Sequence, residues 1–513
     1  MAETADVVET VKQGYAFEGP AIELGALLVD GTPNPEAAVR IPLSMVNRHG
    51  LVAGATGTGK TKTLQLMAEQ LSAAGVAVFA ADIKGDLSGI SQPGQESEKL
   101  LARTKTIGQD WSATGFPTEF YALGGQGTGV PIRATITSFG PVLLSKVLGL
   151  NDVQESSLGL IFHYADKQGL TLLDLKDLRA VINHLTSDDG KADLKDLGGL
   201  SAATAGVILR ALIGFADQGA EAFFGEAEFD TADLLQQKDG KGVVSLLELP
   251  NLQDRPALFS TFLMWLLADL FHDLPEVGDV DKPKLVFFFD EAHLLFADAS
   301  KAFLDSIAQT VRLIRSKGVG VFFVTQTPKD VPDDVLAQLG SRVQHQLRAH
   351  TPNDAKALKA TVSTFPNSSY DLGEVLTQLG IGEAVVTVMN EKGAPTPVAW
   401  TRLRAPLSLM APATAEQLTA AVQASAGNAK YTEVIDRESA YEKLAAKVQA
   451  GAEQAEAEAQ NKPAPEPKAA PRSQKQDKGM VEQVVGSSAF KQFARSAGRE
   501  IIRGLFGAAR RKR

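Results

Sequence analysis

The sequence has no cysteine among its 513 residues. This absence excludes disulfide bonds, thiolate zinc sites, iron–sulfur clusters and cysteine nucleophiles, so any metal ion must be bound by oxygen or histidine ligands. Aromatic residues are also scarce, at 6% of the chain, whereas hydrophobic residues together make up 44%. This composition is typical of a globular protein whose core is packed mainly with aliphatic side chains.

Signals for membrane insertion and secretion are also missing. No uncharged apolar run reaches the roughly 18 residues that a bilayer-spanning helix needs, and the first ten residues contain no basic stretch followed by an apolar one. We therefore expect a cytoplasmic protein. No repeat with a period of about 20 to 50 residues is present either, which disfavours solenoids and propellers.

Negative charge dominates the chain, but not its end. The formal net charge is −10, and residues 487–513 carry eight Lys or Arg against one Glu, a net +7, which leaves −17 for the rest. Lys491, Arg495, Arg499 and Arg503 recur every four residues beside an apolar stripe. This pattern predicts a basic amphipathic helix that binds anionic lipid at the membrane periphery, nucleic acid phosphates or a partner subunit, or that stays solvated without a target.

Short apolar runs alternate with helical patterns from residue 49 to 405. This alternation predicts a mainly parallel β-sheet covered by helices on both faces, an α/β fold. Within it, Leu and Ala at helical spacing between residues 138 and 237 predict a helical insertion. The other expected parts are a small N-terminal cap at 1–48, C-terminal helices at 406–460, a flexible linker at 461–486 and the basic helix at 487–513.

A glycine-rich loop follows the first apolar run of this core. Residues 54–61, GATGTGKT, match the phosphate-binding pattern G-x-x-x-x-G-K-[ST] completely. Such a loop points backbone N–H groups at phosphate oxygens, and the next helix directs the positive end of its dipole at them. Lys60 is expected to reach the β- and γ-phosphates of ATP, and the Thr61 hydroxyl to bind Mg²⁺. The residues expected to bind the nucleotide are Gly54, Ala55, Thr56, Gly57, Thr58, Gly59, Lys60, Thr61 and Thr63.

The segment KLVFFFDEAH provides acidic residues at the end of a second apolar run. A hydrolytic site needs them because Mg²⁺ must be held opposite the loop and the attacking water must be polarised. We predict that Asp290 binds Mg²⁺ through water and that Glu291 orients or deprotonates the attacking water. The alternative is a strand followed by a helix that Asp290 merely caps. His293, just inside that helix, is either part of the site or an ordinary packed or exposed residue.

A third apolar run, GVGVFFVT, carries a candidate residue near each end. Gln326 follows the run and is expected to act in catalysis by contacting the γ-phosphate or fixing the attacking water. The alternative is a plain polar residue at a strand end. Arg315 precedes the run, far in sequence from the other motifs, and is a candidate to act on the nucleotide of a neighbouring subunit.

Taken together, these motifs resemble those of a known superfamily. The segments GATGTGKT, ADIKGDL, FFFDEAH and RSKGVGVFFVTQ resemble the HerA/FtsK superfamily of hexameric motor ATPases, over most of residues 49–405. NRHGLVAGATGTGKTKTLQ and GREIIRGLFG further resemble a bacterial family of HerA-like ATPases. The resemblance implies a RecA-like P-loop NTPase core, ATP and Mg²⁺ as cofactors, a hexameric homo-oligomer and DNA as a candidate partner.

The resemblance also implies a role for one arginine. In motors of this kind, an arginine eleven residues before the sensor glutamine reaches the γ-phosphate bound by the next subunit. Arg315 stands at that distance from Gln326, since 326 − 315 = 11. Arg342 is the reserve candidate, with a structural ion pair as its alternative role.

ADIKGDL places Asp82, Lys84 and Asp86 after the phosphate-loop helix, where the superfamily has acidic residues that face the nucleotide. A capped turn is the alternative for these residues. Two features of the superfamily have no visible counterpart. Only about 50 residues precede the phosphate loop, where HerA has a sizeable barrel, and the membrane spans and DNA-reading winged helix of FtsK are not evident.

Three functions fit these features. The first is a ring-shaped ATPase that hydrolyses ATP to move nucleic acid or protein, as a translocase or helicase. The second is an ATP-dependent switch or scaffold that acts on a protein or membrane partner through the basic tail, without translocation. The third, a small-molecule kinase, is disfavoured because Glu291 and an arginine that acts between subunits suit hydrolysis.

Overall fold

The computed structural model describes residues 2–194, 198–249, 256–278, 280–296, 301–433, 435 and 437–461. Its contacts divide the chain into two compact units, residues 1–449 and 450–513. Apart from residue 461, the predicted linker and the predicted basic helix at 487–513 lie outside the described residues. The elements described below belong to the first unit, except that helix α17 (Ala440–Asn461) continues into the second.

One sheet of twelve strands organises the first unit, in the spatial order β2, β1, β14, β13, β12, β3, β11, β10, β4, β9, β5, β6. The strands from β12 to β6 run parallel, and the other four are antiparallel to their neighbours. The predicted mainly parallel sheet is therefore confirmed. The strands are β1 (Ala21–Val29), β2 (Thr32–Pro42), β3 (Gly50–Ala53), β4 (Ala77–Asp82), β5 (Thr118–Leu123), β6 (Val130–Ile132), β9 (Val244–Glu248), β10 (Leu285–Phe289), β11 (Val319–Thr325), β12 (Ser341–Gln344), β13 (Glu383–Thr387), β14 (Ala399–Leu403) and, as a separate hairpin, β7 (Gln237–Lys238) and β8 (Lys241–Gly242).

The parallel strands are apolar along their length because both faces of the sheet are covered. Strand β10 shows this most clearly, since all five of its residues are fully buried. Phe287 and Phe289 pack into the hydrophobic core on one face, and Phe288 packs into the core on the other. The unbroken apolar runs of the sequence are thus strands that are buried on both sides.

Helices form both covering layers. Helices α1 and α2 contribute to one hydrophobic core, and α4, α5, α6, α8, α9 and α11 contribute to the other. Among the described residues, no helix has both the length and the apolar character needed to cross a membrane. The helices are α1 (Ala2–Gly14), α2 (Lys60–Ala73), α3 (Glu98–Thr106), α4 (Ile136–Val147), α5 (Asp152–Lys167), α6 (Leu175–Thr186), α7 (Asp188–Asp193), α8 (Ala202–Asp217), α9 (Pro256–Asp273), α10 (His293–Phe296), α11 (Lys301–Ile314), α12 (Asp333–Leu336), α13 (Pro352–Val362), α14 (Leu372–Gln378), α15 (Ala415–Ala424) and α16 (Ala426–Thr432).

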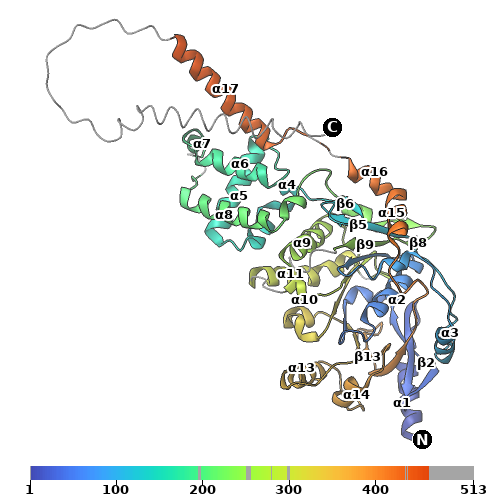
Figure 1. Cartoon of the computed structure of the whole chain (residues 1–513). Helices are drawn as coiled ribbons and strands as arrows, with labels where there is room; N and C mark the ends of the chain where they lie inside the picture. Colours follow the sequence, from blue (N-terminus) through green and yellow to red (C-terminus); the bar gives the residue numbers. More distant parts are fainter. Residues whose placement is uncertain are drawn as a thin grey trace, which may run out of the picture. The chain divides into compact units, whose positions relative to one another are not determined.

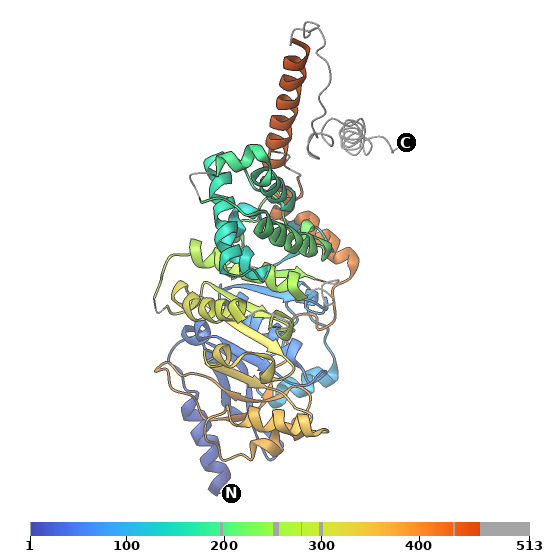
Figure 2. The same ribbon diagram turned by 90° about the vertical axis from the view of Figure 1, so that its left-hand side faces the viewer.

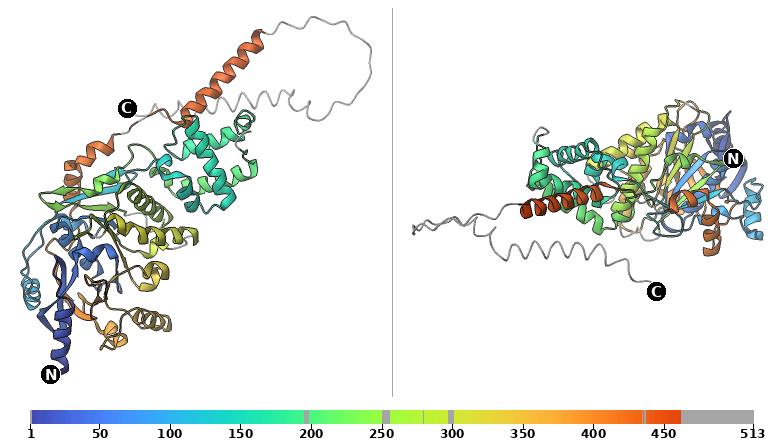
Figure 3. Two further views of the ribbon diagram at one scale, coloured as in Figure 1. Left: turned by 180° about the vertical axis from the view of Figure 1, so that it is seen from behind. Right: turned by 90° about the horizontal axis from the view of Figure 1, so that it is seen from above.

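Helices α4 to α8 occupy most of the span for which a helical insertion was expected. Each begins at a polar residue whose side chain accepts a backbone N–H of the first turn, as Asn151 does for α5 and Asp174 for α6. Figures 1 and 2 show α5, α6, α7 and α8 gathered beside the end of the sheet that carries β5 and β6. Both views in Figure 3 show this group extending beyond the sheet.

The first 48 residues contribute two strands to the same sheet. Strand β1 pairs with β14, and β2 pairs with β1 at the outer edge. Strands β14 and β13 separate them from the parallel strands, and α1 packs beside β1 and β2. The division of the chain at residue 48, and the bounds 138–237 and 406–460, stay predictions.

Candidate functional site

The phosphate loop and the predicted acidic pair lie at one edge of the sheet. Gly54 follows β3, Gln326 follows β11 and Asp290 follows β10. These three strands are parallel, with β11 between the other two. The carboxyl ends of parallel strands meet at the same edge, which is where open α/β sheets bind their ligands. The structure therefore brings these three parts of the predicted site together.

The phosphate loop depends on glycine. Gly57 and Gly59 have φ angles of 83° and 115°, in the left-handed region that favours glycine. Gly54 has no room for a side chain, because a Cβ there would lie 2.4 Å from the Cβ of His345. Helix α2 begins directly after the loop, at Lys60, so that the unpaired N–H groups of its first turn face the loop.

Backbone hydrogen bonds join this loop to three other strands. The N–H of Gly54 donates to the last carbonyl of β11 (3.2 Å), and the N–H of Ala55 donates to the carbonyl of Gln346, just after β12 (2.8 Å). The N–H of Gly382, just before β13, donates to the carbonyl of Thr58 (3.1 Å). The shape of the loop is therefore set by the ends of its neighbours as well as by its own glycines.

Lys60 lies on the inner side of the loop. Its Nζ donates to the carbonyls of Gly54 (2.7 Å) and Ala55 (3.2 Å). Burial lowers the pKa of Lys60, while the nearby Glu291 and Asp290 act to raise it. This arrangement holds an ammonium group between the loop and the acidic pair, where it can reach an anion bound to the loop.

A buried pair supports the loop from behind. Thr63, in the first turn of α2, is 2% exposed, and its Oγ1 lies 2.9 Å from Nε2 of His345. Burial lowers the pKa of His345 to about 4, so the imidazole is neutral at pH 7. The Thr63 hydroxyl thus faces the protein interior. His345 was not predicted, because nothing in the sequence relates position 345 to position 63.

The acidic pair is almost fully buried. Asp290 is 3% exposed and Glu291 is 7% exposed. Burial, followed by the neighbouring Glu291, raises the pKa of Asp290 to about 7. Glu291 Oε1 forms an ion pair with Lys84, and its Oε2 lies 3.3 Å from Nδ1 of His293. His293 is therefore brought to the site, beside the predicted general base.

Glu291 also has an unusual backbone. Its φ is 49°, which costs a residue with a Cβ about 1 kcal/mol. Its N–H donates to Oδ1 of Asp290 (2.9 Å), and the N–H of Ala292 donates to the carbonyl of Val324 on β11 (2.9 Å). These bonds hold the turn that directs the Glu291 side chain, so the geometry of the pair is enforced by its surroundings.

Asp82 shapes the loop that carries Lys84. It is fully buried, and its two carboxylate oxygens accept hydrogen bonds from the N–H groups of Gly85 (2.8 Å) and Leu87 (2.9 Å). Burial raises the pKa of Asp82 to about 6, against the effect of these bonds. These contacts match the alternative in which Asp82 caps a turn. The same turn carries Lys84, which forms the ion pair with Glu291.

Asp290, Asp82 and Glu248 lie at the ends of three adjacent strands, β10, β4 and β9, and form an acidic row. Glu248 ends β9 and stands in register with Asp82 at the end of β4. It is 7% exposed, and burial, followed by Asp82, raises its pKa to about 7. Oε1 of Glu248 and Oδ1 of Asp86 are buried without a hydrogen-bond partner among the described residues. Glu248 was not predicted, although the run VVSLLE ends in it, as FFFD ends in Asp290.

Gln326 and Arg315 lie at opposite ends of β11. Gln326 is exposed between two threonines that bind one carboxylate: Thr325 Oγ1 and the N–H of Thr327 both donate to Oδ2 of Asp330 (2.6 and 3.0 Å). Arg315 lies in a short 3₁₀ turn at the amino end of the strand. Seven residues of strand span about 20 Å, so Arg315 is not brought to the phosphate loop of its own chain.

Arg342, Arg348 and Arg103 each contact a backbone carbonyl. Arg342, the reserve candidate, donates to the carbonyl of Thr364, and burial lowers its pKa. Arg348 Nη2 lies 3.4 Å from the carbonyl of Thr56 in the phosphate loop. Arg103 Nη2 donates to the carbonyl of Gly382 (2.9 Å). Arg348 and Arg103 were not predicted, since only the fold brings their segments to the loop.

The described residues contain no group of three or more His, Asp or Glu side chains arranged to hold a metal ion. At nucleotide sites Mg²⁺ is commonly bound by one or two protein oxygens together with phosphates and water. Thr61 in the first turn of α2 and Asp290 at the end of β10 supply oxygens of that kind. The residues present therefore fit the predicted cofactor.

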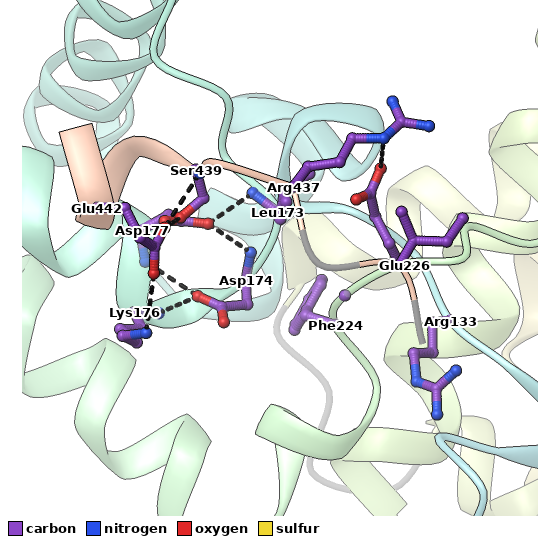
Figure 4. Close-up of a pocket in the computed structure, with 12 residues that line it drawn as sticks. Arg133, Leu173, Asp174, Lys176, Asp177, Phe224, Glu226, Arg437, Ser439 and Glu442 are labelled. Atoms are coloured by element: carbon purple, nitrogen blue, oxygen red, sulfur yellow. Dashed lines mark hydrogen bonds and ion pairs between the residues drawn. The ribbon is translucent and has the colours of Figure 1, made fainter. Parts of the chain in front are cut away.

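A separate cavity of about 250 Å³ lies away from these residues. Figure 4 shows it between α6, the segment around Glu226 and the start of α17, with Arg437 reaching Glu226 (3.5 Å). Its lining includes Asp174 and Asp177, which cap α6. None of its twelve lining residues is a predicted site residue, so it is separate from the predicted nucleotide site.

Comparisons with known proteins agree on one family for this chain. The family model described as helicase HerA-like C-terminal matches residues 28–513. The DNA double-strand break repair helicase HerA of Sulfurisphaera tokodaii is 24% identical over 377 residues, which cover 72% of this chain and 67% of that protein. HerA of Saccharolobus solfataricus is 23% identical over 388 residues, covering 74% and 68%.

Solved structures show the same fold. The unbound bacterial conjugative coupling protein TrwB has a TM-score of 0.51 at 17% identity, covering 79% of this chain and 94% of that one. TrwB in complex with ADP and Mg²⁺ has a TM-score of 0.50 at 18% identity, covering 78% and 95%. This likeness confirms the predicted RecA-like P-loop fold.

The acidic row makes stability depend on pH. A carboxyl whose pKa is raised on folding stabilises the fold at low pH, and this contribution is lost as the pH rises through its folded-state pKa, about 7 for Glu248. The free energy of unfolding of wild type should therefore fall between pH 5 and pH 8. Glu248→Gln cannot titrate at this position, so its free energy of unfolding should fall by roughly 1–3 kcal/mol less over the same range. Urea unfolding at both pH values measures the difference.

The exposed Glu36, replaced by Gln, is the control and should behave as wild type. If Glu248→Gln shows the same loss of stability between pH 5 and pH 8 as wild type, Glu248 does not hold a proton in the folded protein.

Proposed function

Because the chain belongs to the family of helicase HerA-like C-terminal proteins, we propose that it is a Mg²⁺-dependent ATPase. One observation carries the proposal: the phosphate loop after β3 and the buried Asp290 and Glu291 after β10 meet at one edge of the sheet. Only β11 separates the two strands. A nucleotide bound by the loop would therefore present its γ-phosphate towards the acidic pair.

The phosphate loop would bind the nucleotide through its backbone and Lys60. The N–H groups of the loop and of the first turn of α2 suit phosphate oxygens, and Lys60 would move from loop carbonyls to the β- and γ-phosphates. Bound Mg²⁺, held by Thr61 and through water by Asp290, would neutralise phosphate charge. Burial raises the pKa of Asp290, and a cation bound nearby would act in the opposite direction and favour its charged form.

Glu291 would act as the general base. It would accept a proton from the water that attacks the γ-phosphate, while Gln326 fixes that water or contacts the phosphate. In the present arrangement Oε1 of Glu291 is paired with Lys84. For Oε1 to accept the proton, Lys84 must release it, and a γ-phosphate is an anion that competes for the ammonium group.

We further propose a homo-oligomer, with six subunits by resemblance, in which Arg315 serves the neighbouring nucleotide. Arg315 lies at the amino end of β11, the opposite edge from its own phosphate loop. Two similar proteins are named DNA double-strand break repair helicases, and this favours DNA as the polymer on which the ring acts as a translocase.

The alternative is an ATP-dependent switch or scaffold at a protein or membrane partner. It is favoured by the net charge of +7 on residues 487–513, which suits a peripheral position on an anionic membrane. The two functions differ in what stimulates hydrolysis: DNA in the first, anionic vesicles or a protein in the second.

The first test separates binding from hydrolysis. Glu291→Gln keeps the size of the side chain but not its basicity, so it should lower the rate of ATP hydrolysis by about 10²–10⁴-fold and leave ATP binding within a few-fold. Lys60→Ala should weaken ATP binding itself. A phosphate-release assay and equilibrium binding with Mg²⁺ measure both. Full hydrolysis by Glu291→Gln would remove Glu291 from the mechanism.

The second test asks whether Arg315 acts between subunits. Arg315→Ala and Glu291→Gln should each be inactive alone, but mixed subunits should regain activity, because some interfaces then join an intact Glu291 to an intact Arg315. Lys60→Ala mixed with Glu291→Gln is the matched control, because both residues serve the same nucleotide and every site in that mixture keeps one defect. Hydrolysis is measured with double-stranded DNA, single-stranded DNA or anionic vesicles.

Recovery only in the Arg315 mixture, with stimulation by DNA, supports the ring translocase. Failure of the mixture to regain activity, although mixed oligomers form, contradicts a role for Arg315 between subunits. Stimulation by vesicles and not by DNA favours the switch or scaffold.

A further inference from the structure

One exposed isoleucine stands beside the phosphate loop. Ile381 lies between α14 and β13 and is 75% exposed, the largest fraction among the exposed large hydrophobic side chains of the described residues. The next residue, Gly382, donates its N–H to the carbonyl of Thr58 in the phosphate loop (3.1 Å). An exposed apolar side chain thus stands directly before a residue that is hydrogen-bonded to the phosphate loop.

The turn that carries Ile381 is firmly held. The carbonyl of Gly382 accepts hydrogen bonds from the N–H of Leu403 (3.0 Å) and from Arg103 Nη2 (2.9 Å). The N–H of Gly380 donates to Oε2 of Glu383 (3.0 Å), and the N–H of Glu383 donates back to the carbonyl of Gly380 (3.0 Å). Because both flanking residues are fixed, Ile381 cannot easily turn inward to escape water.

The sheet order indicates what would cover this side chain. Asp290 and Glu291 lie on the β11 and β10 side of the phosphate loop, so the γ-phosphate of a bound nucleotide is directed to that side. The rest of the nucleotide must leave on the other side of β3, where β12 and then β13 follow. The amino end of β13 lies at the carboxyl edge of β12, because the two strands are antiparallel. Ile381 precedes that end.

We infer that Ile381 forms a subsite for the base of the bound nucleotide, with its side chain packed against the face of the purine ring. This inference rests on the proposed function. The faces of a nucleobase are flat and largely apolar, and contact with an isoleucine removes water from both surfaces. The glycines on either side leave no competing side chain next to Ile381 in the turn.

The test compares a ligand that has a base with one that lacks it. β,γ-Imido-ATP and tripolyphosphate, each with Mg²⁺, are titrated into full-length wild type, Ile381→Ala and Ile381→Leu. The control is Ile213→Ala, which truncates an isoleucine that is 47% exposed on α8. Ile381→Ala should weaken β,γ-imido-ATP about tenfold and leave tripolyphosphate within twofold. Ile381→Leu and Ile213→Ala should bind both ligands as wild type does.

Equal weakening of both ligands in Ile381→Ala would overturn the inference, because it would show that Ile381 only supports the phosphate loop. Unchanged binding of both would overturn it as well, and a changed oligomeric state with unchanged binding would assign Ile381 to a contact between copies. If wild type binds neither ligand, the proposed function fails and the base subsite with it. Thermal unfolding of each variant shows whether the fold is intact.

Discussion

The curled conformation of the phosphate loop depends on hydrogen bonds that come from outside it. Its first two amides donate to the ends of β11 and β12, and the carbonyl of Thr58 accepts from Gly382 before β13. The sheet places β12 and β11 on either side of β3 and β13 next to β12, so the strand order decides where these hydrogen-bond partners lie. The same strand order places Gln326, Asp290 and Glu291 on one side of the loop and Ile381 on the other, so one topological constraint orders the whole site.

The carboxyl groups buried at the candidate site are unfavourable for the stability of the fold. Glu248 and Asp82 end β9 and β4, Asp290 follows the adjacent β10, and burial raises the pKa of each. Lys62 lies near this row, where burial lowers its pKa and Asp86 and Asp82 act to raise it. A surplus of buried carboxylates is unfavourable in the free protein, and a cation bound beside them would lower that cost.

Local signals in the sequence predicted the parts of the site that lie within single segments. The segment with the phosphate loop and the segment with Asp290 and Glu291 each show an apolar strand followed by a turn and the start of a helix. The unbroken apolar run of β10 likewise predicts a strand that is buried on both faces. Contacts between distant segments could not be predicted in this way. His345 meets Thr63 only because β12 pairs with β3, and Lys84 meets Glu291 only because β4 pairs with β10. The position of Arg315 at the opposite edge likewise follows from the length of β11.

Hydrogen–deuterium exchange with and without Mg²⁺ and β,γ-imido-ATP tests the central claim most directly. If the nucleotide binds a loop that is fixed by its neighbours, exchange should slow in residues 54–63 and also at the bonded ends of β11, β12 and β13, while α5 to α8 remain unchanged. Slower exchange in 54–63 alone would contradict the coupling of the loop to these strands. Unchanged exchange in 54–63, at nucleotide concentrations well above those expected for saturation, would contradict the site itself.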